Sequence, residues 1–147
     1  HNGEKALDEC MKAYGGFEGN AQTLRILTKL EKKQRNCNTL SGIENAIDQR
    51  LGLNFCYRSV ASIVKYDTEI PKERDVCAEL HKGYYYTEKS LVDEIKMNVL
   101  GTKNVEMKTI ECQIMDIADD IAYSTYDLED ALKAGFIKPL DMLAVDD

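Results

Sequence analysis

The chain has 147 residues, of which 44% are hydrophobic and 31% are charged, and its formal net charge is −7. This length and balance are typical of one globular domain with a buried core, and they exclude a disordered chain. The negative charge argues against non-specific nucleic-acid binding, although local lysines and arginines can still bind an anionic ligand. No apolar run reaches the roughly 18 residues of a membrane span.

The N-terminal third of the chain predicts three helices. Residues 4–14 form the first apolar-periodic segment, which Gly15-Gly16 would end. Residues 21–33 form the second, and Asn20 is placed to cap it. Ser41 and Glu44 have capping-box spacing, which predicts a third helix over 43–51.

The rest of the chain predicts three more helices and a loop. A fourth helix is expected over 59–66, ending before Pro71, and residues 81–87 are expected to form a loop. A fifth helix is expected over 88–100 and ends at Gly101. A sixth is expected to begin near Val105 and to end before Gly135. With two prolines and little alternation of apolar and polar residues, the chain is predicted to be all-α.

The five cysteines are widely spaced and odd in number, and no CxxC pair indicates zinc or redox chemistry. We therefore expect most of them to be buried thiols in a cytoplasmic protein.

The sixth predicted helix carries an unusual polar stripe. Its apolar side contains Ile110, Ile114 and Ile121, and Asp119, Tyr123 and Asp127 follow one another every four residues on another side. On periodicity alone, a solvated face is the favoured interpretation. The alternative is a site in which Asp119 binds a divalent cation, and Tyr123 and Asp127 contact a sugar.

Five stretches of the chain, taken together, indicate a family. They are HNGEKAL (1–7), GGFEGNAQTLRILTKLE (15–31), IVKYDTEIP (63–71), KGYYYTEK (82–89) and IADDIAYSTYDLEDALKAG (117–135). In sequence and in order they resemble the deoxyguanosine-triphosphate triphosphohydrolase family of the HD-domain phosphohydrolases. The resemblance implies a multi-helix HD-domain-like bundle, of which residues 1–147 form a single incomplete segment.

The resemblance also implies roles for the polar stripe. Asp119 matches a ligand of a divalent metal ion, with Mg²⁺ or Mn²⁺ expected. Tyr123 matches a residue beside the sugar and phosphates, and Asp127 matches one that binds the sugar 3′-hydroxyl. On this basis the stripe is a site wall rather than a wet face.

The N-terminal residues His1 and Glu4 match the family's catalytic histidine and its partner glutamate. Their spacing puts them on one helical face, where Glu4 can orient His1. An imidazole with a pKa near 6.5 is suited to proton transfer at neutral pH. Without the resemblance, an exposed terminal histidine is the ordinary interpretation.

Three further residues match phosphate contacts, namely Lys65, Tyr66 and Lys82. A lysine is a natural point-charge partner for a phosphate, although a solvated surface amine is the commoner case. Asn20 is expected to face the ligand as well as to cap its helix. The three tyrosines at 84–86 would either flank a nucleobase or pack a loop.

The family's first metal-binding histidine and its His-Asp pair precede the position of His1. We therefore expect an internal fragment of a larger cytoplasmic, homo-oligomeric enzyme. The parent would hydrolyse a deoxynucleoside triphosphate to a deoxynucleoside and inorganic triphosphate, and the fragment alone would be inactive. One alternative is a catalytically dead nucleotide-binding or helical regulatory module, and a less favoured one is an HD-type phosphodiesterase or nucleotidase.

Overall fold

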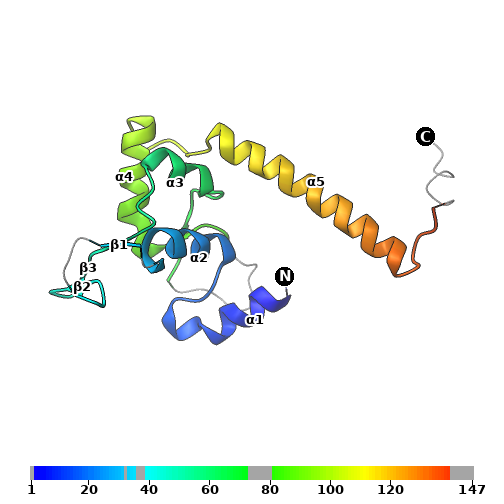
Figure 1. The fold of residues 1–147 in the computed structure, drawn as a ribbon, viewed down its shortest axis with the longest axis horizontal. Coiled ribbons are helices and arrows are strands. Elements are labelled where there is room, and N and C mark those ends of the chain that lie inside the picture. Colours follow the sequence, from blue (N-terminus) through cyan, green and yellow to red (C-terminus); the bar gives the residue numbers. More distant parts are fainter. Residues whose placement is uncertain (1, 32, 36–38, 73–80, 140–147) are drawn as a thin grey trace. The chain divides into compact units, whose positions relative to one another are not determined.

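The computed structural model describes residues 2–31, 33–35, 39–72 and 81–139 (Figure 1). The chain divides into two compact units, residues 1–112 and 113–147. The described structure is mostly helical, as predicted, but it also contains three pairs of short strands, so the all-α prediction is wrong in that respect. The HD-domain arrangement of the helices stays a prediction.

The first two predicted helices are present in shorter form. Helix α1 spans Asn2–Cys10 and is followed by a 3₁₀ turn, η1, at Lys12–Tyr14. Helix α2 spans Gly19–Arg25, and a π-helical turn, η2, continues it over Ile26–Leu30. The first segment ends where glycine was expected to end it, because Gly15 adopts the left-handed conformation with φ of 99°.

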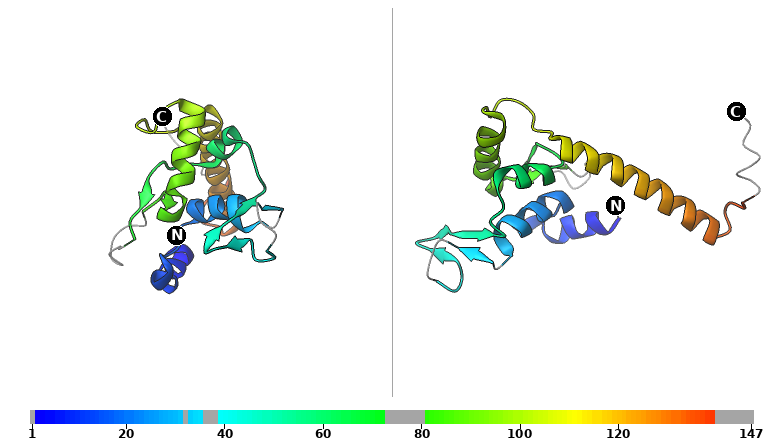
Figure 2. Two further views of the ribbon diagram at one scale, coloured as in Figure 1. Left: turned by 90° about the vertical axis from the view of Figure 1, so that its left-hand side faces the viewer. Right: turned by 45° about the horizontal axis from the view of Figure 1, so that its top comes forward.

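The third predicted helix is wrong, because these residues form a β-hairpin that projects from the helices (Figures 1 and 2). Strand β2, Ile43–Glu44, pairs antiparallel with β3, Ile47–Asp48. Asn45 and Ala46 connect them with φ of 50° and 62°, the conformation of a tight two-residue hairpin turn. Asparagine accepts this conformation readily, so the local turn prevails over the apparent capping box.

A second antiparallel pair lies at the base of this hairpin. Strand β1, Gln34–Arg35, pairs with β4, Arg50–Gly52. A Cβ at Gly52 would lie 2.2 Å from the backbone oxygen of Leu27, so only glycine allows β4 to pack so closely on η2.

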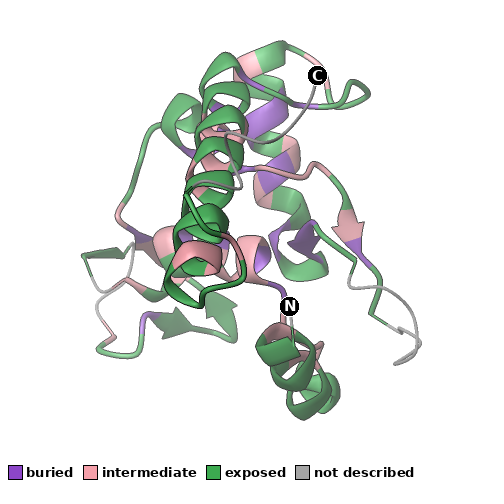
Figure 3. Cartoon of the chain, turned by 90° about the vertical axis from the view of Figure 1, so that its right-hand side faces the viewer, coloured by how far each residue is buried: buried purple, intermediate pink, exposed green. Residues whose placement is uncertain are grey.

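The core of the first unit lies between α2, helix α3 (Tyr57–Ile63) and helix α4 (Lys89–Leu100), where the buried residues in Figure 3 gather. It is formed by Leu24, Val60, Ala61, Val64, Tyr84, Val92, Ile95 and Met107. Helix α4 agrees closely with the predicted fifth helix, and Gly101 ends it in the left-handed conformation.

The predicted loop over 81–87 contains a strand and a turn. Strand β6, Tyr84–Tyr85, pairs in parallel with β5, Glu69–Ile70. A 3₁₀ turn, η3, follows at Tyr86–Glu88 and leads into α4. The pairing brings the segment after α3 beside the segment before α4.

Helix α5 spans Ile110–Lys133 and begins five residues later than Val105. The Thr109 hydroxyl accepts a hydrogen bond from the backbone N–H of Cys112 at 3.2 Å, as an N-cap residue does. The predicted apolar side is largely exposed in the described chain, where Ile114 and Ile121 are both more than 60% accessible. Among the described helices, none is long and apolar enough to cross a membrane.

The cysteine prediction is wrong for two of the three described residues. Cys10 and Cys56 are exposed free thiols, and Cys112 is buried. Cys37 and Cys77 lie outside the described residues.

Candidate functional site

Three predicted phosphate contacts come together in the first unit. The Lys82 amine donates a hydrogen bond to the Tyr66 hydroxyl at 3.3 Å and lies 5.2 Å from the centre of the ring. The Lys65 amine lies 5.9 Å from the same ring centre. Lys82 is exposed and the other two are half-buried. We call these residues the lysine–tyrosine cluster, which presents two positive charges around one phenol.

The pairing of β5 with β6 explains why residues 16 positions apart meet. The Tyr84 N–H donates to the backbone oxygen of Thr68 at 2.9 Å. A Cβ at the intervening Gly83 would lie only 2.0 Å from that same oxygen. Glycine at position 83 therefore permits the approach that carries Lys82 to Tyr66.

Asp67, which immediately follows Tyr66, fixes this segment to the core. Its Oδ2 accepts from the Lys96 amine at 2.6 Å and from the Met107 backbone N–H at 2.7 Å. The aspartate side chain is 1% exposed and the lysine side chain 11%, so the ion pair is buried. The Asp67 Oδ1 is also buried and has no hydrogen-bond partner among the described residues.

Sequence reasoning missed this ion pair. The signal was present in α4, where Lys96 occupies the same helical side as the buried Val92 and Ile95. A lysine among core positions needs a buried partner, because burial of an unpaired ammonium is costly. The sequence did not show which acid supplies it.

Glu4 has a partner other than the predicted one in the described structure. Its Oε1 accepts from the backbone N–H of Gly19 at 3.0 Å, and one turn on, Asp8 accepts from Phe17 N–H at 2.7 Å. One side of α1 is therefore hydrogen-bonded to the start of α2. His1 lies outside the described residues, so the His1–Glu4 pair stays a prediction.

Asn20 does not cap its helix, which corrects that prediction. Glu18 is the N-cap residue, and its Oε2 accepts from Ala21 N–H at 2.8 Å. The Asn20 amide donates to the other oxygen of Glu18 at 2.7 Å. A longer carboxylate thus takes the capping role, and Asn20 supports it from within the first turn.

Tyrosines 84–86 were expected either to flank a nucleobase or to pack a loop, and Tyr84 and Tyr85 pack within the protein. Tyr84 and Tyr85 are buried, while Tyr86 is exposed. The Arg25 guanidinium lies 4.1 Å from the centre of the Tyr85 ring and forms an ion pair with Glu88 at 3.1 Å. Tyr85 is therefore enclosed by protein and presents no open ring face on that side.

The polar stripe of α5 lies in the second unit. Asp119 is half-buried, and Tyr123 and Asp127 are exposed. Among the described residues there is no group of three histidine, cysteine or acidic side chains placed to hold a metal ion. Asp119 alone does not make a metal site, because a tightly held divalent ion takes several protein ligands.

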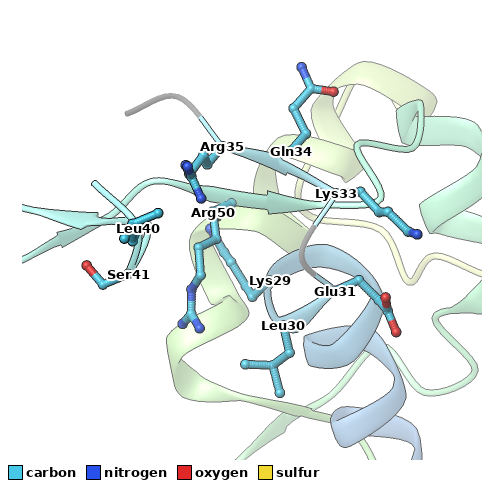
Figure 4. Close-up of a pocket in the computed structure, with 10 residues that line it drawn as sticks. Lys29, Leu30, Glu31, Lys33, Gln34, Arg35, Leu40, Ser41 and Arg50 are labelled. Atoms are coloured by element: carbon cyan, nitrogen blue, oxygen red, sulfur yellow. Dashed lines mark hydrogen bonds between the residues drawn. The ribbon is translucent and has the colours of Figure 1, made fainter. Parts of the chain in front are cut away.

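Two cavities of the first unit lie away from these residues. One of about 520 Å³ is surrounded by η2, β1, β4 and residues 40–42, and is drawn in Figure 4. The other, of about 650 Å³, lies between η2, β4, α3 and α4. Neither cavity is lined by a residue predicted from the sequence to bind substrate or metal.

The described residues thus form a mostly helical protein in which basic side chains gather in the lysine–tyrosine cluster and around the cavity of about 520 Å³. No protein-family model matches the chain. The chain is 57% identical over its full length to deoxyguanosinetriphosphate triphosphohydrolase-like protein 2 of Mesorhizobium japonicum. It is 35% identical over 98% of its length to a deoxyguanosinetriphosphate triphosphohydrolase-like protein of Streptomyces coelicolor. A similarly named protein of Corynebacterium efficiens is 37% identical over 93% of the chain.

The similarity confirms the resemblance predicted from the five stretches. The chain spans 31%, 31% and 29% of the lengths of these three relatives. It is therefore similar to one segment, about a third, of triphosphohydrolase-like proteins.

Proposed function

We propose that the whole protein hydrolyses a deoxynucleoside triphosphate, with dGTP as the first substrate to test, to a deoxynucleoside and inorganic triphosphate. The observation that supports this most is the 57% identity, over the full chain, to a relative named deoxyguanosinetriphosphate triphosphohydrolase-like protein 2. In the reaction, the oxygen of water forms a bond to the α-phosphorus. The bond from that phosphorus to the 5′-oxygen breaks, and the 5′-oxygen leaves with a proton.

In this proposal the lysine–tyrosine cluster holds the phosphate chain. The ammonium groups of Lys65 and Lys82 lie 5.9 and 5.2 Å from the centre of the Tyr66 ring. A triphosphate in contact with both would gain charge-assisted hydrogen bonds, which are stronger than neutral ones. The Tyr66 hydroxyl, already bonded to Lys82, would orient that amine toward the ligand.

Asp67 is a positioning residue in the same proposal. It lies between Tyr66 and the strand pairing of β5, and the buried pair with Lys96 holds the backbone there. The segment carrying Lys65 and Tyr66 is thus anchored before substrate arrives. Such preorganisation reduces the conformational entropy that is lost when the substrate binds.

The remaining roles rest on the family resemblance. His1, oriented by Glu4, would transfer the proton that the reaction requires. Asn20 would contact substrate, and Tyr123 and Asp127 would bind the sugar. Asp119 would supply one ligand of a divalent metal ion, Mg²⁺ or Mn²⁺, with its other ligands contributed by other parts of the whole protein.

The test uses the full-length gene product, with dGTP as substrate and deoxyguanosine and triphosphate measured by chromatography. A variant with Lys65→Ala and Lys82→Ala should lose at least about tenfold in kcat/KM, since each lost contact to a charged group is worth about 1.5–3 kcal/mol. Lys103→Ala is the matched control, because this lysine is exposed and lies elsewhere. Its kcat/KM should not change.

Two outcomes would count against the proposal. If the double variant turns over dGTP like the Lys103→Ala control, the lysine–tyrosine cluster is not part of the substrate site. If the wild-type protein binds dGTP with its lysines intact but releases no triphosphate, the protein is a catalytically dead nucleotide-binding module instead.

A further inference from the structure

The cavity between η2, β1 and β4 gathers positive charge in an acidic protein. Of the ten described residues that line it, four are basic and one, Glu31, is acidic. The whole chain carries a formal charge of −7, so this local sign is opposite to the global one. The volume of about 520 Å³ lies within the range of small-molecule sites, roughly 300–1,000 Å³.

The strand pairing brings two of the basic residues together. Arg35 of β1 pairs with Arg50 of β4 in the antiparallel ladder, next to an irregularity of the register between Gln34 and Arg35. Like charges on paired strands repel one another, which disfavours the pairing. Asp48 forms an ion pair with Arg50, whereas among the described residues no carboxylate pairs with Arg35.

Arg50 is held in place by its neighbours. Asp48 accepts from its guanidinium Nε at 2.9 Å and from Nη2 at 2.8 Å, while the Lys29 amine donates to the Arg50 backbone oxygen at 3.3 Å. A Cβ at Gly42 would lie 2.4 Å from the Arg50 Cγ, so glycine makes room for the arginine stem. The charge is therefore fixed before any ligand binds.

The cavity is lined by both basic and apolar side chains. Lys29, Arg35 and Arg50 come from η2, β1 and β4, and Lys33 points away from Arg35 and Arg50 in Figure 4. Leu30 and Leu40 also line the cavity, and Leu40 is 93% exposed. A ligand with a charged part and an organic part would match this lining.

We propose that this pocket binds a phosphate chain, through Lys29, Arg35 and Arg50, and we call it the arginine pocket. Guanidinium groups match phosphate oxygens in pairs, and three cations suit two or more phosphates better than one. A bound anion would also neutralise Arg35, which has no carboxylate partner among the described residues, and so reduce its repulsion from Arg50. The site is separate from the lysine–tyrosine cluster, none of whose residues lines this cavity.

The test is a calorimetric titration of the full-length protein with inorganic triphosphate. Lys65 and Lys82 are replaced by alanine throughout, so that binding at the lysine–tyrosine cluster does not contribute. In this background Arg35→Ala should weaken binding about tenfold or more, the effect of one lost charged contact. Arg58→Ala removes the same charge from an exposed ion pair outside the pocket and should leave the affinity unchanged.

A second variant should move the affinity in the opposite direction. Asp48→Asn keeps an acceptor for the Arg50 backbone N–H but removes the carboxylate that competes with a bound phosphate. Triphosphate should therefore bind more tightly to this variant than to its background. A general loss of folding cannot produce tighter binding, so this arm separates the proposal from structural damage.

The source of the phosphate chain is resolved by comparing inorganic triphosphate with a non-hydrolysable nucleoside triphosphate. If the nucleotide binds more tightly and Leu40→Ala removes the difference, its organic part lies on the leucines. Equal affinities would identify the phosphate chain alone as the ligand. The proposal is overturned if Arg35→Ala and Arg58→Ala bind triphosphate equally well, or if the background protein does not bind it.

Discussion

Two ion pairs of the first unit have the same chemistry and opposite surroundings. The pair of Asp67 and Lys96 is almost fully buried, whereas both side chains of the pair of Arg58 and Glu111 are about half exposed. Each joins segments far apart in the chain. Exposure to water, rather than the N···O distance, therefore determines how much each ion pair contributes to stability. Water screens the exposed pair and is excluded from the buried one.

The largest expected effect comes from breaking the buried pair on one side. Lys96→Met leaves the Asp67 carboxylate buried beside the core without its cation, and should lower the free energy of unfolding by about 3–5 kcal/mol. Urea unfolding of the variant and the wild-type protein measures this loss.

The matched control combines Lys96→Met with Asp67→Asn. The amide still accepts from the Met107 N–H but has no charge to leave unpaired. Its stability should therefore recover part of the loss. If the double variant is no more stable than Lys96→Met, the lost energy comes from packing and not from the unpaired charge.

A smaller effect, visible only at alkaline pH, is expected from Tyr84 beside the buried pair. Burial raises the pKa of the Tyr84 phenol, and the nearby Asp67 adds to the rise. The folded state then keeps the proton after the unfolded state has lost it. The contribution of Tyr84 to stability is complete below the ordinary tyrosine pKa, near 10, and is lost as pH rises through the raised value.

Tyr84→Phe should remove this component of the alkaline loss. Urea unfolding of both proteins at pH 8 and above pH 10 measures it, with Tyr14→Phe as an exposed comparison. An identical decline in the wild-type protein and Tyr84→Phe would mean that other groups cause the whole alkaline effect.

The smallest effect is expected from the exposed pair. Arg58→Ala should change stability far less than Lys96→Met, and the change should shrink further in 1 M NaCl. The hydrogen bond from Arg58 lowers the pKa of Glu111. The contribution of Glu111 to stability is therefore present above the ordinary glutamate pKa and is lost as pH falls through the lowered value. If Arg58→Ala lowers the free energy of unfolding as much as Lys96→Met does, exposure does not determine what these ion pairs contribute.

Some of the fold was predictable because it depends on local signals. Helix α4 has regular apolar spacing and a terminal glycine, and its observed end agrees with the prediction. The hairpin was not predicted, because Ser41 and Glu44 imitate a capping box and only Asn45 hints at a tight turn. The start of α5 was misplaced because Thr109, not a residue near Val105, provides the cap.

The candidate site was likewise predicted only in part. Lys65, Tyr66 and Lys82 were named from the sequence through a family resemblance, and the structure brings them together. Asp67 and the arginine pocket were missed. Both depend on contacts between distant residues, such as the register that puts Arg35 opposite Arg50. A pattern within one segment contains no information about such a partner.

The close contact at Gly83 determines which natural variants of this protein can survive. Every other amino acid adds the same Cβ, which would meet the Thr68 oxygen at 2.0 Å, so alanine should be excluded as firmly as leucine. In a saturation library, position 83 would accept one residue only. The neighbouring exposed position 82 would accept many residues for folding, and if Lys82 holds phosphate as we propose, only a positive charge there would preserve activity.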